Sequence, residues 1–208
     1  MTTKEIADKI QQKKAGMKLF LVAIDGHGGS GKTTLVNDLI KLLEPLSLLV
    51  QVVPMDAFIA VEPRSEWKTL KNYPKASTPY KIDTERLKRE VLEPLKSGHV
   101  ATYTFHKDWW NTLASEKMTI APEGIVIIEG CYSLTRSLRD YYDYKIFVDC
   151  SLAICMDRVS RRDVSLGGNP VTAPLFWKEI YFPAETAYME NEEPKLVADI
   201  VLEGGNRI

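Results

Sequence analysis

The chain has 208 residues, with 27 lysines and arginines against 28 aspartates and glutamates and a formal net charge of −1. This length suits a single domain with a substantial core, and the balanced charge argues against nucleic-acid or anionic-membrane partners. No apolar stretch is long enough to cross a membrane, and the three cysteines form no CxxC pair. We therefore expect a cytoplasmic protein without a disulfide framework.

Helical and strand patterns alternate in the first part of the chain. The predicted elements are a polar helix over 1–14, a buried strand over 19–24, a helix over 33–43 and a strand over 48–53. Four prolines then interrupt residues 54–81. An irregular stretch of this length in a compact domain is usually a functional loop.

The alternation continues to the end of the chain. The predicted elements are a helix over 85–96 capped by Asp83 or Thr84, strands over 99–104, 116–120 and 125–130, a helix over 134–141, a strand over 144–149, helices over 152–163 and 175–191, and a strand over 198–203. Pro183 lies inside the 175–191 pattern and predicts either a kink or two helices there. Strands that alternate with helices indicate a parallel α/β sheet, whose ligands bind beyond the carboxyl ends of the strands.

Residues 26–33 read G-H-G-G-S-G-K-T, a full match to the phosphate-binding loop G-x-x-x-x-G-K-[ST]. Its glycines let the backbone turn tightly and present N–H groups to phosphate oxygens. We expect Lys32 to reach the β- and γ-phosphates of ATP and the Thr33 hydroxyl to ligate Mg²⁺. The predicted nucleotide-binding residues are Gly26, His27, Gly28, Gly29, Ser30, Gly31, Lys32, Thr33 and Thr34.

Two carboxylates follow predicted strands, as phosphoryl transfer requires. Glu129 ends the run IVIIE and is a candidate Mg²⁺ ligand, directly or through water. Asp56 follows the strand after the loop helix, where it could accept a proton from an acceptor hydroxyl or bind Mg²⁺ through water. The alternatives are an ordinary acid at a strand end for Glu129 and a turn cap for Asp56.

Arg158, Arg161 and Arg162 lie on a predicted helix beside the break at Gly167 and Gly168. Arginine suits the charge of a phosphoryl transition state, and glycines beside it suggest a mobile lid. A solvated basic helix face is the alternative.

An aromatic-rich set in the middle of the chain suits a flat ring and a sugar, or plain core packing. Its members are Tyr80, Asp83, Tyr103, Phe105, His106, Trp109 and Trp110.

These motifs together resemble the uridine kinase and phosphoribulokinase family of P-loop kinases. The resemblance is carried by AIDGHGGSGKTT, MDAF, DTERLKREVLEPLKSG, ATYTFH, IVIIEG, the FVD segment leading into the arginine helix, and ADIVLEG. It implies a nucleoside kinase-like α/β fold with a parallel five-stranded sheet flanked by helices. It also implies one kinase domain over 1–208, with an acceptor-binding insertion at about 54–120 and a lid at about 158–174.

The resemblance also implies residue roles. Asp56 matches the catalytic base, Lys32, Thr33 and Glu129 match phosphate and metal residues, Asp83, Tyr103 and His106 match acceptor-site residues, and Arg158 and Arg162 match lid arginines. The chain departs from the family at NYPKASTPYKID, where uridine kinases have a stretch like FDHP. It departs again at Gly167-Gly168-Asn169, where they have Arg-Gly-Arg, and His106 comes two residues early.

The expected function is transfer of the γ-phosphate of Mg²⁺-ATP to an alcohol of a small molecule, with the uridine or cytidine 5′-hydroxyl as the leading acceptor. Another nucleoside, a pantothenate-like alcohol or a sugar phosphate are alternatives within the class. An acceptor-independent ATPase or nucleotide-binding module is a further alternative, although the N-K-x-D motif of GTPases is absent from the sequence. Family members are often homo-oligomers.

Overall fold

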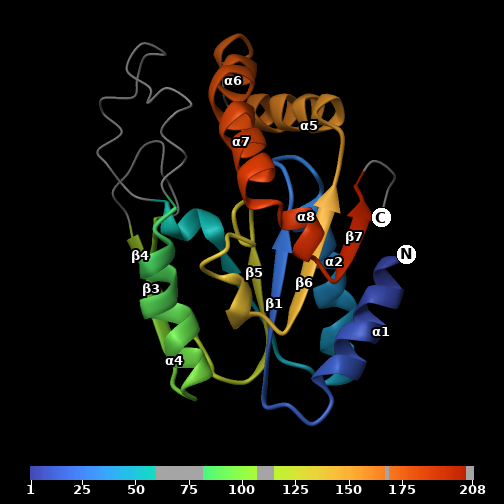
Figure 1. Ribbon diagram of the computed structural model, residues 1–208, viewed down its shortest axis with the longest axis vertical. Helices are drawn as coiled ribbons and strands as arrows, with labels where there is room; N and C mark the ends of the chain where they lie inside the picture. Colours follow the sequence, from blue (N-terminus) through green and yellow to red (C-terminus); the bar gives the residue numbers. More distant parts are fainter. Residues whose placement is uncertain (60–81, 107–114, 167–168, 205–208) are drawn as a thin grey trace.

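The computed structural model describes residues 1–59, 82–106, 115–166 and 169–204. Five parallel strands form one sheet in the order β2-β5-β1-β6-β7 (Figure 1). These strands are β1 (Leu19–Asp25), β2 (Val50–Pro54), β5 (Gly124–Glu129), β6 (Tyr144–Asp149) and β7 (Ile200–Glu203). The predicted parallel five-stranded sheet is confirmed, and β6 has the predicted bounds.

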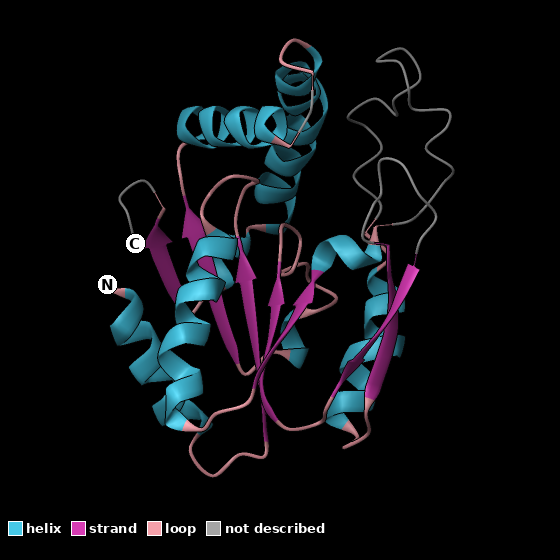
Figure 2. Cartoon of the chain, turned by 180° about the vertical axis from the view of Figure 1, so that it is seen from behind, coloured by secondary structure: helices cyan, strands magenta, loops and turns pink. Residues whose placement is uncertain are grey.

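The central strand is buried on both faces, so its alternate side chains enter two separate cores. Phe20, Val22 and Ile24 pack on one face with α1 (Thr3–Lys14) and α2 (Lys32–Leu43). Figure 2 shows these helices side by side in front of the sheet. A capping box at Thr2 starts α1, and α2 follows the predicted phosphate-binding loop directly.

The second core lies on the opposite face, against Leu21 and Ala23 of β1. It is covered by one helical segment made of α3 (Thr84–Leu87), a π-helical turn (Lys88–Leu92) and α4 (Glu93–Lys96). Asp83 caps this segment, because its carboxylate accepts from the Arg86 N–H at 2.8 Å. An antiparallel hairpin of β3 (Ala101–His106) and β4 (Ser115–Ile120) lies beside it.

Helices beyond the carboxyl edge of the sheet form a cover (Figure 1). They are α5 (Leu152–Ser165), α6 (Thr172–Phe176), a π-helical turn (Trp177–Tyr181) and α7 (Phe182–Glu192). The short helix α8 (Pro194–Val197) follows α7, lies in front of the sheet and leads to β7. Pro183 follows the π-helical turn directly, and residues 172–192 are helical throughout. Proline has no N–H for the helical hydrogen-bond pattern, and this pattern changes from π-helical to α-helical next to Pro183. The sequence predicted a kink or two helices at this place, and the structure has a π-helical turn before the proline.

The helix predicted over 134–141 is wrong. The segment consists of turns with only a short 3₁₀ helix (Arg139–Tyr141). Its backbone groups have tertiary partners instead of helical ones, because the Leu134 N–H donates to Asp25 at 2.7 Å and the Leu134 carbonyl accepts from Arg139 at 2.7 Å. Tyr132 also has a left-handed φ of 73°. These contacts outweigh the helical pattern of the sequence.

Parts of the predicted acceptor-binding and lid regions lie outside the described residues. They include 60–81 with Tyr80, 107–114 with Trp109 and Trp110, and the Gly167-Gly168 break. The single-domain division with its insertion and lid stays a prediction.

Gly130, directly after Glu129, is a glycine at which a side chain should be poorly tolerated. Its φ is 144°, and an added Cβ would come within 2.6 Å of the Met55 Cβ. We expect Gly130→Ala to lower the free energy of unfolding by about 3 kcal/mol, from backbone strain and overpacking together. Urea unfolding monitored by circular dichroism measures this loss.

Gly98 is the matched control, since its φ of 77° is also left-handed but an added Cβ meets nothing within 4 Å. Gly98→Ala should therefore cost only about 1 kcal/mol. Equal losses for the two variants would show that contact with Met55 is not the cause.

Candidate active site

A cavity of about 980 Å³ opens beyond the carboxyl ends of the strands. Its wall combines the phosphate-binding loop, the turn after β2, the end of β5, and the cover formed by α5 and the α6–α7 segment. Lys32, Thr33, Asp56, Glu129, Arg158 and Arg162 all line it. The sequence-predicted phosphate, metal and lid residues are therefore brought together in one place.

The phosphate-binding loop leads into α2 at Gly31, which has a left-handed φ of 110°. Lys32 is only 7% exposed, and its Nζ donates to the carbonyls of Gly26 and His27, both at 2.8 Å. The ammonium group is thus folded against its own loop. The helix N-terminus and the lysine place positive charge at the cavity floor, where an anion is stabilised.

Thr33 and Glu129 meet across the cavity floor. The Thr33 Oγ1 donates to the Glu129 Oε1 at 3.3 Å, which is a long hydrogen bond. Burial raises the pKa of the Glu129 carboxyl, the charge of Lys32 lowers it, and the charge of Asp56 raises it again. A cation placed here would relieve this crowding of negative charge.

The donor set fits Mg²⁺, which binds one or two protein oxygens and completes its octahedral shell with water and phosphate. The Thr33 hydroxyl and the Glu129 carboxylate are such oxygens, on one side of the loop. Within the described ranges, no group of three histidine, cysteine or acidic residues could hold a metal without further ligands. A metal at this place would therefore depend on a bound phosphate.

Asp56 is held next to this pair by the sheet. It lies in the short 3₁₀ helix (Met55–Phe58) that follows β2, and Pro54 of β2 pairs with Glu129 of β5. Two adjacent parallel strands thus deliver one carboxylate each to the same edge, as expected from the sequence. The side chain of Asp56 is exposed to the cavity that it lines.

The two lid arginines have different surroundings. The Arg158 Nη1 donates to the carbonyls of Gly29 at 3.2 Å and Gly204 at 2.8 Å, so it ties the loop to the residue after β7. Arg162 lies 5.5 Å from the ring centroid of Trp177 and pairs with Asp163 at 3.0 Å. Both residues lie on α5, but Arg158 contacts the loop backbone, whereas the contacts of Arg162 are with Trp177 and Asp163 in the cover.

Two of the predicted acceptor residues, Asp83 and Tyr103, have structural roles in the described part of the chain. Tyr103 is 2% exposed, packs against Phe58 at 5.3 Å between ring centroids, and burial raises its pKa to about 12. Asp83 is the helix cap described above, and His106 is the last residue of β3. Neither Asp83 nor Tyr103 is among the described residues that line the cavity. Contact of Asp83, Tyr103 and His106 with an acceptor stays a prediction.

Comparison with known proteins agrees with this arrangement. The model of the Phosphoribulokinase / Uridine kinase family matches residues 21–188. The chain belongs to this family. It is 30% identical to the uridine kinase of Staphylococcus haemolyticus over 196 residues, covering 89% of this chain and 88% of that protein. It is 27% identical to the Escherichia coli K12 uridine kinase over 197 residues, covering 90% and 88%.

Solved structures show the same fold. A proposed fructose transport system kinase from Silicibacter sp. TM1040 aligns with a TM-score of 0.78 at 25% identity, covering 97% of this chain and 98% of that one. A possible uridine kinase from Bacillus stearothermophilus aligns with a TM-score of 0.69 at 25% identity, covering 98% and 100%. Across the part of the chain that is described, no helix has the length and apolarity needed to span a membrane.

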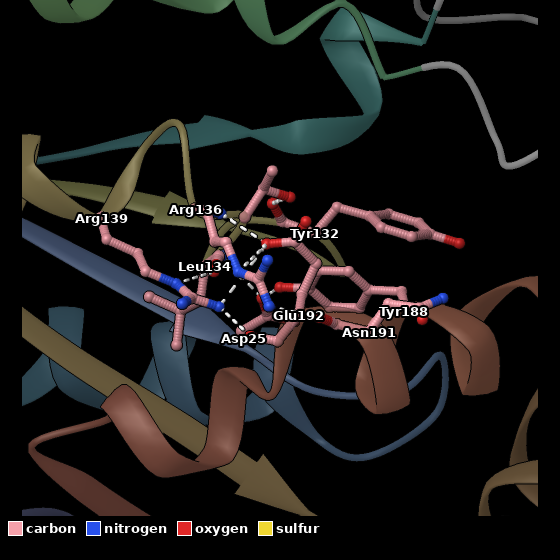
Figure 3. Close-up of polar contacts among 9 residues, drawn as sticks. Asp25, Tyr132, Leu134, Arg136, Arg139, Tyr188, Asn191 and Glu192 are labelled. Atoms are coloured by element: carbon pink, nitrogen blue, oxygen red, sulfur yellow. Dashed lines mark hydrogen bonds and ion pairs between the residues drawn. The ribbon is translucent and has the colours of Figure 1, made fainter.

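The carboxylate of Asp25 lies directly before the phosphate-binding loop and was not predicted from the sequence. Asp25 ends β1, is fully buried, and accepts from the Gly26 N–H at 2.6 Å. It also accepts from the Leu134 N–H and the Tyr188 hydroxyl, both at 2.7 Å (Figure 3). Burial raises the pKa of Asp25, and these hydrogen bonds lower it. The available signal was an acidic residue closing an otherwise apolar strand.

The carboxyl end of α7 is fixed to the same region (Figure 3). The Glu192 carboxylate accepts from the Arg136 N–H at 2.8 Å, and the Arg136 side chain donates to the Asn191 carbonyl at 2.6 Å. The Arg139 guanidinium donates to the Glu192 carbonyl. The connection between β5 and β6 therefore fixes the position of the carboxyl end of α7.

Glu185, one turn before Tyr188, is a second missed residue. It is 6% exposed, and its Oε2 lies 3.0 Å from both the His27 Nδ1 and the Gly28 N. Trp177 lies over the same loop, because a Cβ added to Gly28 would come within 2.4 Å of its ring. Nothing in the local sequence singles out this glutamate, since its partners lie almost the whole chain away.

The bond between Tyr188 and Asp25 should be worth more than a neutral hydrogen bond. We expect Tyr188→Phe to lower the free energy of unfolding by about 2 kcal/mol, because it leaves a buried carboxylate short of a donor. The loss should grow as pH rises through the titration of Asp25, since only the charged form needs the donor strongly. Denaturant unfolding at several pH values measures both effects.

Tyr142→Phe is the matched control. Tyr142 is also buried, yet its hydroxyl has no hydrogen-bond partner among the described residues. Removing this hydroxyl should leave stability nearly unchanged or raise it slightly. A loss as large as that of Tyr188→Phe would mean that the buried hydroxyl itself, and not its bond to Asp25, is responsible.

Proposed function

We propose that this protein is a Mg²⁺-ATP-dependent kinase that transfers the γ-phosphate to a hydroxyl of a small molecule, with the uridine or cytidine 5′-hydroxyl as the leading acceptor. The convergence of the loop, the Thr33–Glu129 pair and Asp56 on one cavity carries this proposal. The family membership and the similarity to uridine kinases support it.

Each residue then has a defined task. The loop amides and Lys32 hold the β- and γ-phosphates, and Lys32 must leave its carbonyl partners on the loop to do so. Mg²⁺ bound by Thr33 and Glu129 supplies charge neutralisation. Asp56 accepts the proton of the acceptor hydroxyl. The hydroxyl oxygen of the acceptor forms a bond to the γ-phosphorus, and the bond between this phosphorus and the leaving ADP breaks.

The charge of the described wall favours an uncharged acceptor. Asp56, Glu129 and Glu185 all line the cavity. The cations beside them are Lys32 and Arg158, both bonded to loop carbonyls, and Arg162, which is paired with Asp163. Each of these cations is thus already bonded to the protein, and a sugar phosphate would need a further cation for its own phosphate group, which supports a nucleoside as the acceptor. An uncharged sugar is the second candidate, because of the likeness to the Silicibacter protein.

The deciding experiment is ADP release from Mg²⁺-ATP across a panel of uridine, cytidine, other nucleosides, fructose, pantothenate and sugar phosphates. Release that depends on uridine or cytidine establishes the proposed acceptor. Dependence on another compound keeps the kinase and replaces the acceptor. Release at one rate regardless of acceptor would contradict the kinase and favour an ATPase.

Lys32→Ala should lower kcat by roughly 100-fold or more, because positioning and charge stabilisation of the phosphates provide most of this catalysis. Lys41→Ala is the control, since Lys41 lies on the same helix but is an exposed partner of Asp38. Steady-state ADP release measures both variants. Wild-type turnover in Lys32→Ala would refute the site.

Asp56→Asn should lower kcat by roughly 100-fold or more while changing ATP affinity little, because an amide cannot accept the acceptor's proton. Calorimetric ATP binding beside steady-state kinetics separates the two. Asp8→Asn, an exposed site on α1, controls for the lost charge. Equal losses in kcat and ATP affinity would instead identify Asp56 as a metal or structural residue.

A further inference from the structure

The phosphate-binding loop already holds an anionic group of the protein itself. The Glu185 Oε2 accepts from the Gly28 N–H at 3.0 Å. Gly28 belongs to the series of amides that the loop offers to phosphate oxygens. A carboxylate oxygen at hydrogen-bond distance from this amide occupies the place where a phosphate oxygen would be bound.

The contact between Glu185 and the loop is buried and is made to more than one loop residue. Glu185 is 6% exposed, and burying a carboxylate is costly unless its oxygens are hydrogen-bonded. The same oxygen also lies 3.0 Å from the His27 Nδ1, so two consecutive loop residues hold it. The Trp177 ring lies against Gly28 and limits the access of water to the contact.

The position of Glu185 is fixed by the rest of α7. Tyr188, three residues on, is bonded to Asp25 beneath the loop, and the end of the helix is held by Arg136 and Arg139. At its amino end, α7 is continuous with the π-helical turn Trp177–Tyr181. Such turns are frequent at functional sites. These contacts fix α7, and α7 in turn fixes the Glu185 carboxylate next to the loop.

We propose that Glu185 is a latch that competes with the nucleotide for the phosphate-binding loop. It closes the cover over the empty loop, and the phosphates of ATP must displace it from the Gly28 amide. His27 is its second partner, so leaving the amide does not leave Glu185 unpaired. This inference rests on the proposed function, since a nucleotide polyphosphate is the displacing ligand.

The latch makes nucleotide affinity lower than the loop alone would give. Glu185→Gln keeps the shape and removes the charge, and should tighten the binding of pyrophosphate and of Mg²⁺-ATP by roughly tenfold, the range of one hydrogen bond to a charged group. Isothermal titration calorimetry measures both ligands. Glu190→Gln is the matched control, because Glu190 lies exposed on the same helix, and should bind as the wild type does.

Glu185→Asp distinguishes competition for the Gly28 amide from simple charge repulsion between the carboxylate and phosphate. It keeps the charge, but from a fixed helix the shorter carboxylate cannot span the 3.0 Å contacts of Glu185 to the loop. It should also tighten pyrophosphate binding several-fold. Unchanged or weaker binding in either variant overturns the latch, as does tightening in Glu190→Gln to the same degree.

Thermal unfolding by circular dichroism confirms that each variant is folded, and the conclusion stands on whichever of the Gln and Asp variants folds. Equilibrium binding requires neither an acceptor nor turnover. The latch can therefore fail while acceptor-dependent ADP release is intact. A wild-type protein that binds neither pyrophosphate nor Mg²⁺-ATP would instead remove the nucleotide site on which the proposed function depends.

Discussion

The buried carboxylate of Asp25 is the constraint on which the rest of the site depends. A fully buried carboxylate is tolerated only when donors surround it. Its donors come from three separate parts of the chain: the start of the phosphate-binding loop, the connection after β5, and α7. Each of these segments must adopt its observed backbone for the carboxylate to be satisfied. One side chain thus sets the relative positions of the cavity floor and its cover.

This constraint also explains why groups of the cover lie close to the phosphate-binding loop. The helix α7 is anchored at Tyr188, and one turn earlier it presents Glu185 to the loop. The same anchoring brings Trp177 over Gly28. The empty cavity therefore has its lysine folded onto loop carbonyls and a carboxylate on a loop amide. Both groups must be rearranged before phosphate enters, so the cost of opening is part of nucleotide affinity.

The sequence predicted those features that depend on local pattern. Periodicity located the strands of the sheet, and the loop motif between β1 and α2 predicted the nucleotide site. Asp56 and Glu129 were predicted to lie at the ligand-binding edge because they follow predicted parallel strands, and β2 and β5 are adjacent in the sheet. Features set by distant partners were beyond this reasoning. The segment 134–141 has a helical pattern but bonds to Asp25 and α7, and Glu185 gains its place only through the packing of α7.

The electrostatics of the empty site couple its protonation to ligand binding. Burial raises the pKa of both Asp25 and Glu129 above the ordinary carboxyl values. Between the ordinary carboxyl pKa and the raised folded-state pKa, the folded protein binds more protons than the unfolded chain. The free energy of unfolding therefore falls as pH rises through this range. A cation beside Glu129 lowers its pKa and removes much of this loss. Binding of a cation beside Glu129 should thus release protons and stabilise the fold most at the higher pH, where the carboxylates are charged.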